Sequence, residues 1–241
     1  MIPIRLDRFV SKALGVTRTD AIKIIQSKQI RINDSSISKK DFNLNPKVDI
    51  VFYQGAQLNY YEKIYLMMNK PVGYVSATVD KKLPTVFDLL SGLKKEDLFI
   101  VGRLDIDSVG LLLITNDGDL AHKITSPKYN IEKEYEVLYY GNMTKEMINS
   151  FCNGIEIEDG RHQKITTKPA KLIISTDNGA QKAEVTISEG KFHQVKRMFE
   201  YFGCEVYHLK RVQIGQLKLD EHLKEGEYRV LSEEEINRLH I

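Results

Sequence analysis

Few cysteines and no long hydrophobic run mark this sequence. Its 241 residues include two cysteines, Cys152 and Cys204, far apart and with no CxxC pair. This argues against a zinc ribbon or a disulfide scaffold, and we expect two core thiols. No apolar run approaches the roughly 20 residues of a membrane span, and residues 1–15 lack a signal-peptide core. We therefore expect a soluble protein of the cytoplasm with no membrane partner.

Nucleotide and calcium motifs are also missing. Neither GxxxxGK[ST] nor GxGxxG occurs, which argues against a kinase or a dehydrogenase. Asp105, Asp107 and Gly110 match the start of a calcium-binding loop. Val109 and Asn116, however, replace an oxygen ligand and the final glutamate of such a loop. We expect no metal site here.

Two histidines are weak candidates for metal ligands. His122 and His193 lie in segments with helical patterning and have no partners at metal-ligand spacing. A structural role is the better interpretation of each.

Charge is unevenly distributed along the chain. Residues 1–60 hold 10 lysines and arginines against 5 aspartates and glutamates, whereas residues 61–241 hold 25 against 28. A basic head on a near-neutral body suggests that the head binds a polyanion. A solvated charged surface is the alternative, and charge alone leaves both interpretations open.

The N-terminal segment predicts two helices and a strand. Leu6, Phe9 and Val10 have helical spacing, and Gly15 can end that helix in the left-handed conformation. Thr17 is expected to cap the second helix, and residues 29–34, "QIRIND", alternate as a strand. Seven basic residues lie between the apolar positions: Arg5, Arg8, Lys12, Arg18, Lys23, Lys28 and Arg31. So small a core favours a binding module over an enzyme.

The rest of the chain is richer in strands. Residues 132–141 alternate as a strand, and residues 193–203, "HQVKRMFEYFG", have helical spacing. Strands do not alternate strictly with helices, which favours an α+β fold with a largely antiparallel mixed sheet flanked by helices. The polar segment 54–63 is expected to be a linker. We place one domain at residues 1–58 and a second at residues 59–241.

Charged and aliphatic residues alternate in residues 103–107. We expect Leu104 and Ile106 to anchor the core while Arg103 and Asp105 face a cleft. Asp107 is expected to shape a turn before a buried strand, "LLLITN". A hydrolase with paired carboxylates is disfavoured, because two neighbours on one strand do not flank a glycosidic bond from opposite sides.

Five segments together resemble a known family. "GRLDIDSVGLLLITNDG", residues 102–118, resembles the signature of the RsuA branch of the pseudouridine synthases. "MNKPVGYVSA", "EKEYEV" and "ISEGKFHQVKRMF" resemble its other motifs. Residues 5–34 resemble the S4 RNA-binding module that precedes the catalytic domain in this branch. The resemblance covers nearly the whole chain, with the motifs in the family's order.

This resemblance implies an enzyme that isomerises uridine in RNA without a cofactor or metal. Asp105 matches the catalytic aspartate and nucleophile, and Tyr135 the tyrosine that stacks on the base. Lys196 matches the basic residue that pairs with the aspartate. The resemblance further implies RNA contacts for residues that include those of the basic head: Arg103, Lys70, Arg197, Arg5, Arg8, Arg18, Lys23, Lys28 and Arg31.

The resemblance also suggests a substrate. "ITSPKYNIEKEYEV" and the helix that follows His193 are more similar to enzymes of 16S ribosomal RNA, with a uridine-516 type site, than to large-subunit relatives. The implied partner is a small-subunit assembly intermediate, met by a monomer. Two alternatives are a synthase that acts on 23S rRNA and a non-catalytic RNA-binding factor of ribosome assembly.

Overall fold

The computed structural model describes residues 4–45, 48–58, 63–93, 95, 97–158, 163–177 and 179–239. The chain forms two compact units, Met1–Glu62 and Lys63–Ile241. No helix within these described ranges is both long enough and apolar enough to cross a membrane.

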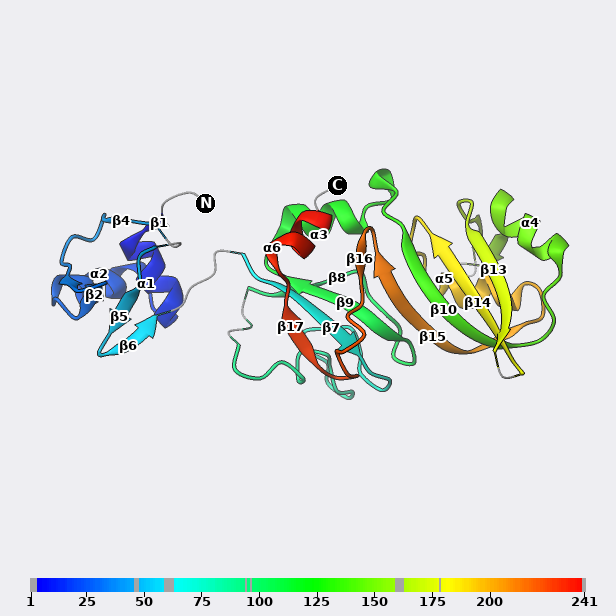
Figure 1. Ribbon diagram of the computed structural model, residues 1–241, viewed down its shortest axis with the longest axis horizontal. Helices are drawn as coiled ribbons and strands as arrows, with labels where there is room; N and C mark the ends of the chain where they lie inside the picture. Colours follow the sequence, from blue (N-terminus) through cyan, green and yellow to red (C-terminus); the bar gives the residue numbers. More distant parts are fainter. Residues whose placement is uncertain are drawn as a thin grey trace. The chain divides into compact units, whose positions relative to one another are not determined.

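The N-terminal unit contains the two helices and the strand that the sequence predicts (Figure 1). They are α1 (Leu6–Leu14), α2 (Arg18–Gln26) and β2 (Ile30–Ile32). Gly15 ends α1 with φ of 67°. Thr17 Oγ1 accepts a hydrogen bond from the Asp20 amide at 3.2 Å and so caps α2. Both helix ends follow the predicted pattern.

Further strands complete this unit. β3 (Ser35–Ser36), β2, β5 (Val51–Tyr53) and β6 (Ala56–Leu58) form one sheet in that order. β1 (Ile4–Arg5) pairs with β4 (Asn43–Leu44). β6 falls inside the predicted linker, so that prediction is wrong for residues 56–58. Residues 59–62, which follow the predicted domain boundary, lie outside the residues that the structure describes.

A large mixed sheet forms the second unit (Figure 1). Its main strand order is β13-β14-β10-β15-β9-β7-β17, and β15–β9 is its parallel pair. The largely antiparallel α+β fold is confirmed. Its strands are β7 (Tyr65–Lys70), β8 (Phe99–Val101), β9 (Val109–Thr115), β10 (Lys133–Tyr140), β13 (Lys171–Asp177), β14 (Ala180–Ile187), β15 (Glu205–Ile214), β16 (Leu217–Lys218) and β17 (Tyr228–Val230). β11 (Glu156–Glu158) and β12 (Lys164–Thr166) form a separate hairpin.

Helices cover both faces of this sheet. α4 (Lys145–Asn153) and α5 (Gln194–Glu200) pack into the larger core, which also contains alternate residues of β10. α3 (Gly118–Thr125) and α6 (Glu233–Leu239) pack against the opposite face of β7 and β9. A short 3-10 helix, Pro127–Tyr129, follows α3. Of the two cysteines, Cys204 is buried as predicted, but Cys152 on α4 is exposed.

The charged alternation is a loop and not a strand. β8 ends at Val101, and the Ser108 amide donates to the Asp105 carbonyl at 3.1 Å, which closes a turn. Leu104 is buried as predicted. Ile106 is 39% exposed, so its predicted place in the core is wrong, because the turn breaks the alternation. All seven residues of β9 are buried, which confirms the strand predicted behind this loop.

Candidate active site

Residues 102–108, here called the Asp105 loop, connect β8 to β9, and a buried arginine ties the start of the loop to β9. Arg211 on β15 is 2% exposed. Its Nε donates to the Leu111 carbonyl at 2.8 Å and its Nη2 to the Gly102 carbonyl at 2.9 Å. Charged donors make strong hydrogen bonds when buried, so Arg211 fixes Gly102, the first residue of the loop, relative to Leu111 in β9.

A buried lysine holds the middle of the loop. Lys70 Nζ donates to the carbonyls of Ser108 at 2.8 Å and Ile106 at 3.4 Å, and to that of Pro71 at 3.0 Å. Burial of the ammonium lowers the pKa of Lys70 to about 8. The predicted RNA contact of Lys70 is wrong, because its side chain is wholly enclosed and its donors are engaged by the protein backbone.

Two smaller features lie beside this loop. Ser76 Oγ donates to the Leu104 carbonyl at 2.7 Å and accepts from the Leu104 amide at 3.1 Å. Gly110 has φ of 100°, and a Cβ there would lie 2.3 Å from the Arg211 carbonyl oxygen. Glycine is therefore required where β9 meets β15.

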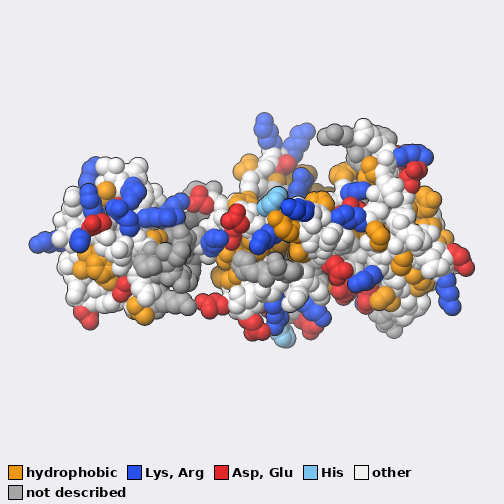
Figure 2. Space-filling model, turned by 90° about the horizontal axis from the view of Figure 1, so that it is seen from above, with side chains coloured by type: hydrophobic (Ala, Val, Ile, Leu, Met, Phe, Trp, Pro, Cys, Tyr) orange, Lys and Arg blue, Asp and Glu red, His pale blue; other side chains and the backbone are white. Residues whose placement is uncertain are grey.

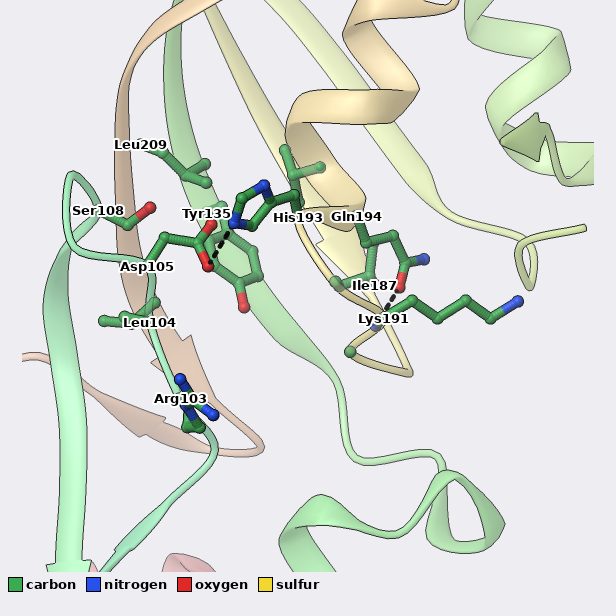
Figure 3. A pocket seen from close by; sticks show the side chains of 12 residues that line it. Arg103, Leu104, Asp105, Ser108, Tyr135, Ile187, Lys191, His193, Gln194 and Leu209 are labelled. Carbon is green, nitrogen blue, oxygen red and sulfur yellow. Dashed lines mark hydrogen bonds and ion pairs between the residues drawn. The ribbon is translucent and has the colours of Figure 1, made fainter. Parts of the chain in front are cut away.

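A pocket opens between this loop, β10 and the start of α5 (Figure 3). Arg103 and Asp105 line it from the loop, Tyr135 from β10 and His193 from the residue before α5. Tyr135 is 7% exposed and packs into the larger core, whereas the Asp105 side chain is 29% exposed. The structure thus brings Asp105, Tyr135 and Arg103 to one pocket, as the sequence predicted.

Lys196 extends from α5 toward the same loop but lies closer to another aspartate. Its Nζ is 4.0 Å from Asp105 Oδ2 and 2.5 Å from Asp107 Oδ1. Although burial raises the pKa of Asp107, the Lys196 hydrogen bond and charge hold that pKa below its usual value. The expected pairing of Lys196 with Asp105 is therefore the longer of two contacts, and Asp107 does more than shape a turn.

His193, for which the sequence predicted a structural role, is a pocket residue. Its Nε2 lies 3.4 Å from Asp105 Oδ1 (Figure 3). The structure thus places His193 at the candidate site, beside Asp105. The only sequence signal was its position in the "HQVKRM" motif, because metal-ligand spacing does not detect a histidine that contacts a carboxylate across the fold.

Arg197 is held by protein contacts. Its guanidinium lies 5.0 Å from the centroid of the Phe192 ring, and its Nη1 donates to the Glu158 carbonyl. Arg103, in contrast, is exposed at the pocket. Of these two predicted RNA-binding residues, the structure leaves Arg103 the more accessible.

Basic side chains gather on the visible face of the N-terminal unit (Figure 2). Asp7 is 1% exposed and pairs with Arg5 at 2.9 Å and Arg18 at 3.0 Å. Burial raises the pKa of Asp7, but hydrogen bonds from these arginines lower it further, below its usual value. The predicted RNA-binding residues of this unit are all exposed: Arg5, Arg8, Arg18, Lys23, Lys28 and Arg31.

Within the described part of the chain, no group of three or more histidine, cysteine, aspartate or glutamate side chains is arranged to hold a metal ion.

Comparisons with known proteins agree on one family. The profile of the RNA pseudouridylate synthases matches residues 64–201. The chain is 40% identical to ribosomal small subunit pseudouridine synthase A of Vibrio cholerae, over 96% of this chain and 97% of that one. It is 40% identical to the RNA pseudouridine synthase YtzG of Bacillus subtilis, over 98% of each chain. A crystal structure of a pseudouridylate synthase superposes with a TM-score of 0.67 at 37% identity, over 98% of this chain and 99% of that one.

Proposed function

The chain belongs to the RNA pseudouridylate synthase family, and on this premise we propose that it converts one uridine of 16S ribosomal RNA, of the uridine-516 type, to pseudouridine. The observation that carries the proposal is the pocket in which Asp105 lies beside Tyr135, with His193 and Lys196 within 4.0 Å of its carboxylate. The name of the Vibrio cholerae relative supports the small-subunit substrate.

In the proposed reaction the bond between C1′ of the ribose and N1 of uracil breaks. The base rotates, and C1′ forms a new bond to C5. The hydrogen on C5 is lost, and N1 gains one, so the product is an isomer of the substrate. Asp105 is the proposed nucleophile, because its carboxylate is accessible from the pocket and is held on a rigid loop.

Tyr135 and Lys196 have complementary parts in this proposal. The Tyr135 ring, held by the core, offers a surface on which the extruded uracil can stack. Extrusion of a base costs a few kcal/mol, and stacking offsets part of that cost. The Lys196 ammonium, 4.0 Å from Asp105, can stabilise the negative charge on the detached uracil.

We further propose that residues 1–58 act as an S4-like module that contacts the phosphate backbone. The exposed basic side chains of this unit support that assignment. The proposal includes a monomeric enzyme in the cytoplasm that acts on a small-subunit assembly intermediate. It includes no cofactor and no metal, and the net isomerisation requires no external oxidant, reductant or group donor.

Mapping of pseudouridines in ribosomal RNA from a deletion strain tests the substrate. Loss of one pseudouridine from 16S rRNA, restored by the wild-type gene, is the expected result. Loss of a site in 23S rRNA would instead identify a large-subunit synthase. An unchanged set of pseudouridines would favour the non-catalytic assembly factor.

A further inference from the structure

His193 occupies a backbone conformation that few residues adopt. Its φ is 50° and its ψ is 31°, in the left-handed region, immediately before α5. A non-glycine residue there carries a steric cost that the surrounding structure must offset. This conformation places the imidazole over the pocket and away from the helix that follows (Figure 3).

Two neighbouring side chains support the imidazole. The Phe192 ring stacks on it, with the centroids 3.8 Å apart and the planes inclined by 20°. The Arg197 guanidinium lies over the Phe192 ring at 5.0 Å. The stack restricts the imidazole to an orientation in which Nε2 faces Asp105 Oδ1 at 3.4 Å.

The other oxygen of Asp105 lies near Lys196, at a longer distance. Lys196 Nζ lies 4.0 Å from Oδ2, because its short contact is with Asp107. His193 and Lys196 therefore approach different oxygens of one carboxylate. An imidazole protonated at Nε2, neutral or charged, can donate to Oδ1 and leave Oδ2 as the oxygen that faces a substrate.

We propose that His193 is a positioning residue that orients the Asp105 carboxylate for attack on the uridine. This inference rests on the proposed role of Asp105 as the nucleophile. A carboxylate that rotates freely presents its reacting oxygen in the correct direction for only part of the time, and a misplacement of about 1 Å can cost about 100-fold in rate.

The test is replacement of His193 by glycine followed by rescue with imidazole. Glycine adopts the left-handed conformation without strain, so His193→Gly removes the ring and keeps the backbone. We expect the single-turnover rate of pseudouridine formation to fall about 10- to 100-fold while RNA affinity stays within about twofold. Added imidazole should raise the rate of His193→Gly at least about tenfold. It should leave the wild-type rate unchanged.

A second variant guards against misfolding of the first. Asparagine also tolerates the left-handed region, so His193→Asn should fold, but it lacks the stacked ring. It should show the same loss of rate at unchanged RNA affinity. Wild-type rates in both variants would overturn the inference, as would a loss confined to RNA affinity. A slow His193→Gly enzyme that imidazole does not restore would also overturn it.

Asp105→Asn, assayed in parallel, separates this inference from the proposed function. An inactive Asp105→Asn beside fully active His193 variants would refute the role of His193 alone. An active Asp105→Asn would refute the proposed nucleophile whatever the His193 variants show.

Discussion

Lys196 lies between two aspartates, with its Nζ 2.5 Å from Asp107 Oδ1 and 4.0 Å from Asp105 Oδ2. Asp107 is 62% exposed in its side chain, whereas the side chain of Asp105 is 29% exposed. The shorter contact thus goes to the more exposed carboxylate, where solvent screens the attraction between the two charges. Lys196 can therefore leave Asp107 at little cost when a substrate enters the pocket.

This relationship predicts unequal effects of the two partners. Lys196→Met should lower the single-turnover rate about 100-fold or more, because it removes the cation beside Asp105, the proposed nucleophile. Asp107→Asn should change the rate by less than about threefold, because an exposed ion pair contributes only about 0–1 kcal/mol. Release of the hydrogen from C5 of uridine measures both rates. Equal, large losses in the two variants would contradict this division of roles.

The ring and the hydroxyl of Tyr135 can be separated. Tyr135→Leu should weaken binding of the substrate RNA about 10- to 100-fold, because loss of base stacking costs about 1–3 kcal/mol. Tyr135→Phe keeps the ring and should bind the RNA like the wild type. Titration of labelled RNA measures the affinity, and urea unfolding checks that each variant is folded. Wild-type affinity in Tyr135→Leu would remove the stacking role.

Lys70 predicts a change of stability with pH. Its pKa in the folded protein is about 8, against about 10.4 in an unfolded chain. Between these values the unfolded chain binds a proton that the folded chain does not, so the free energy of unfolding rises with pH. This single group can contribute up to about 3 kcal/mol of that rise.

Lys70→Met isolates this effect from that of Lys133, whose pKa burial also lowers to about 8. Urea unfolding at pH 7.5 and pH 10 should show a stronger stabilisation with pH in the wild type than in Lys70→Met. The variant should also be slower in catalysis, because the carbonyls of Ile106 and Ser108 lose their donor. Parallel pH profiles of stability would contradict the assigned burial of the ammonium.

The basic head predicts how RNA binding depends on salt. Lys23→Gln together with Lys28→Gln should weaken binding of different RNA sequences to a similar degree. Each lost phosphate contact should reduce the slope of log affinity against log salt by about 1. Lys145→Gln, an exposed lysine on α4, serves as the matched control. An unchanged slope in the double variant would argue against the head as an RNA contact.

Local patterns in the sequence predicted local structure well. The cap at Thr17, the left-handed Gly15 and the buried strand β9 each depend on residues close together in the chain. The motifs also indicated that Asp105 and Tyr135 belong to one site, and both residues line the same pocket. Short-range backbone preferences and ordered motifs are sufficient for predictions of this kind.

Contacts between distant residues were beyond such patterns. Lys70 resembled a surface cation, but its ammonium binds carbonyls 36 and 38 residues further along the chain. Arg211 reaches back across 100 residues to Leu111. The contact of His193 with Asp105 depends in the same way on how α5 and the Asp105 loop are brought together by the sheet.

Replacement of Asp105 tests the central claim most directly. Wild-type protein and Asp105→Asn, which keeps the size of the side chain and removes its charge, would be incubated with 16S rRNA transcripts and with small-subunit particles. The account predicts one pseudouridine with the wild type and none with the variant, while both proteins bind the RNA with similar affinity. Pseudouridine formed by Asp105→Asn at the wild-type rate would contradict it.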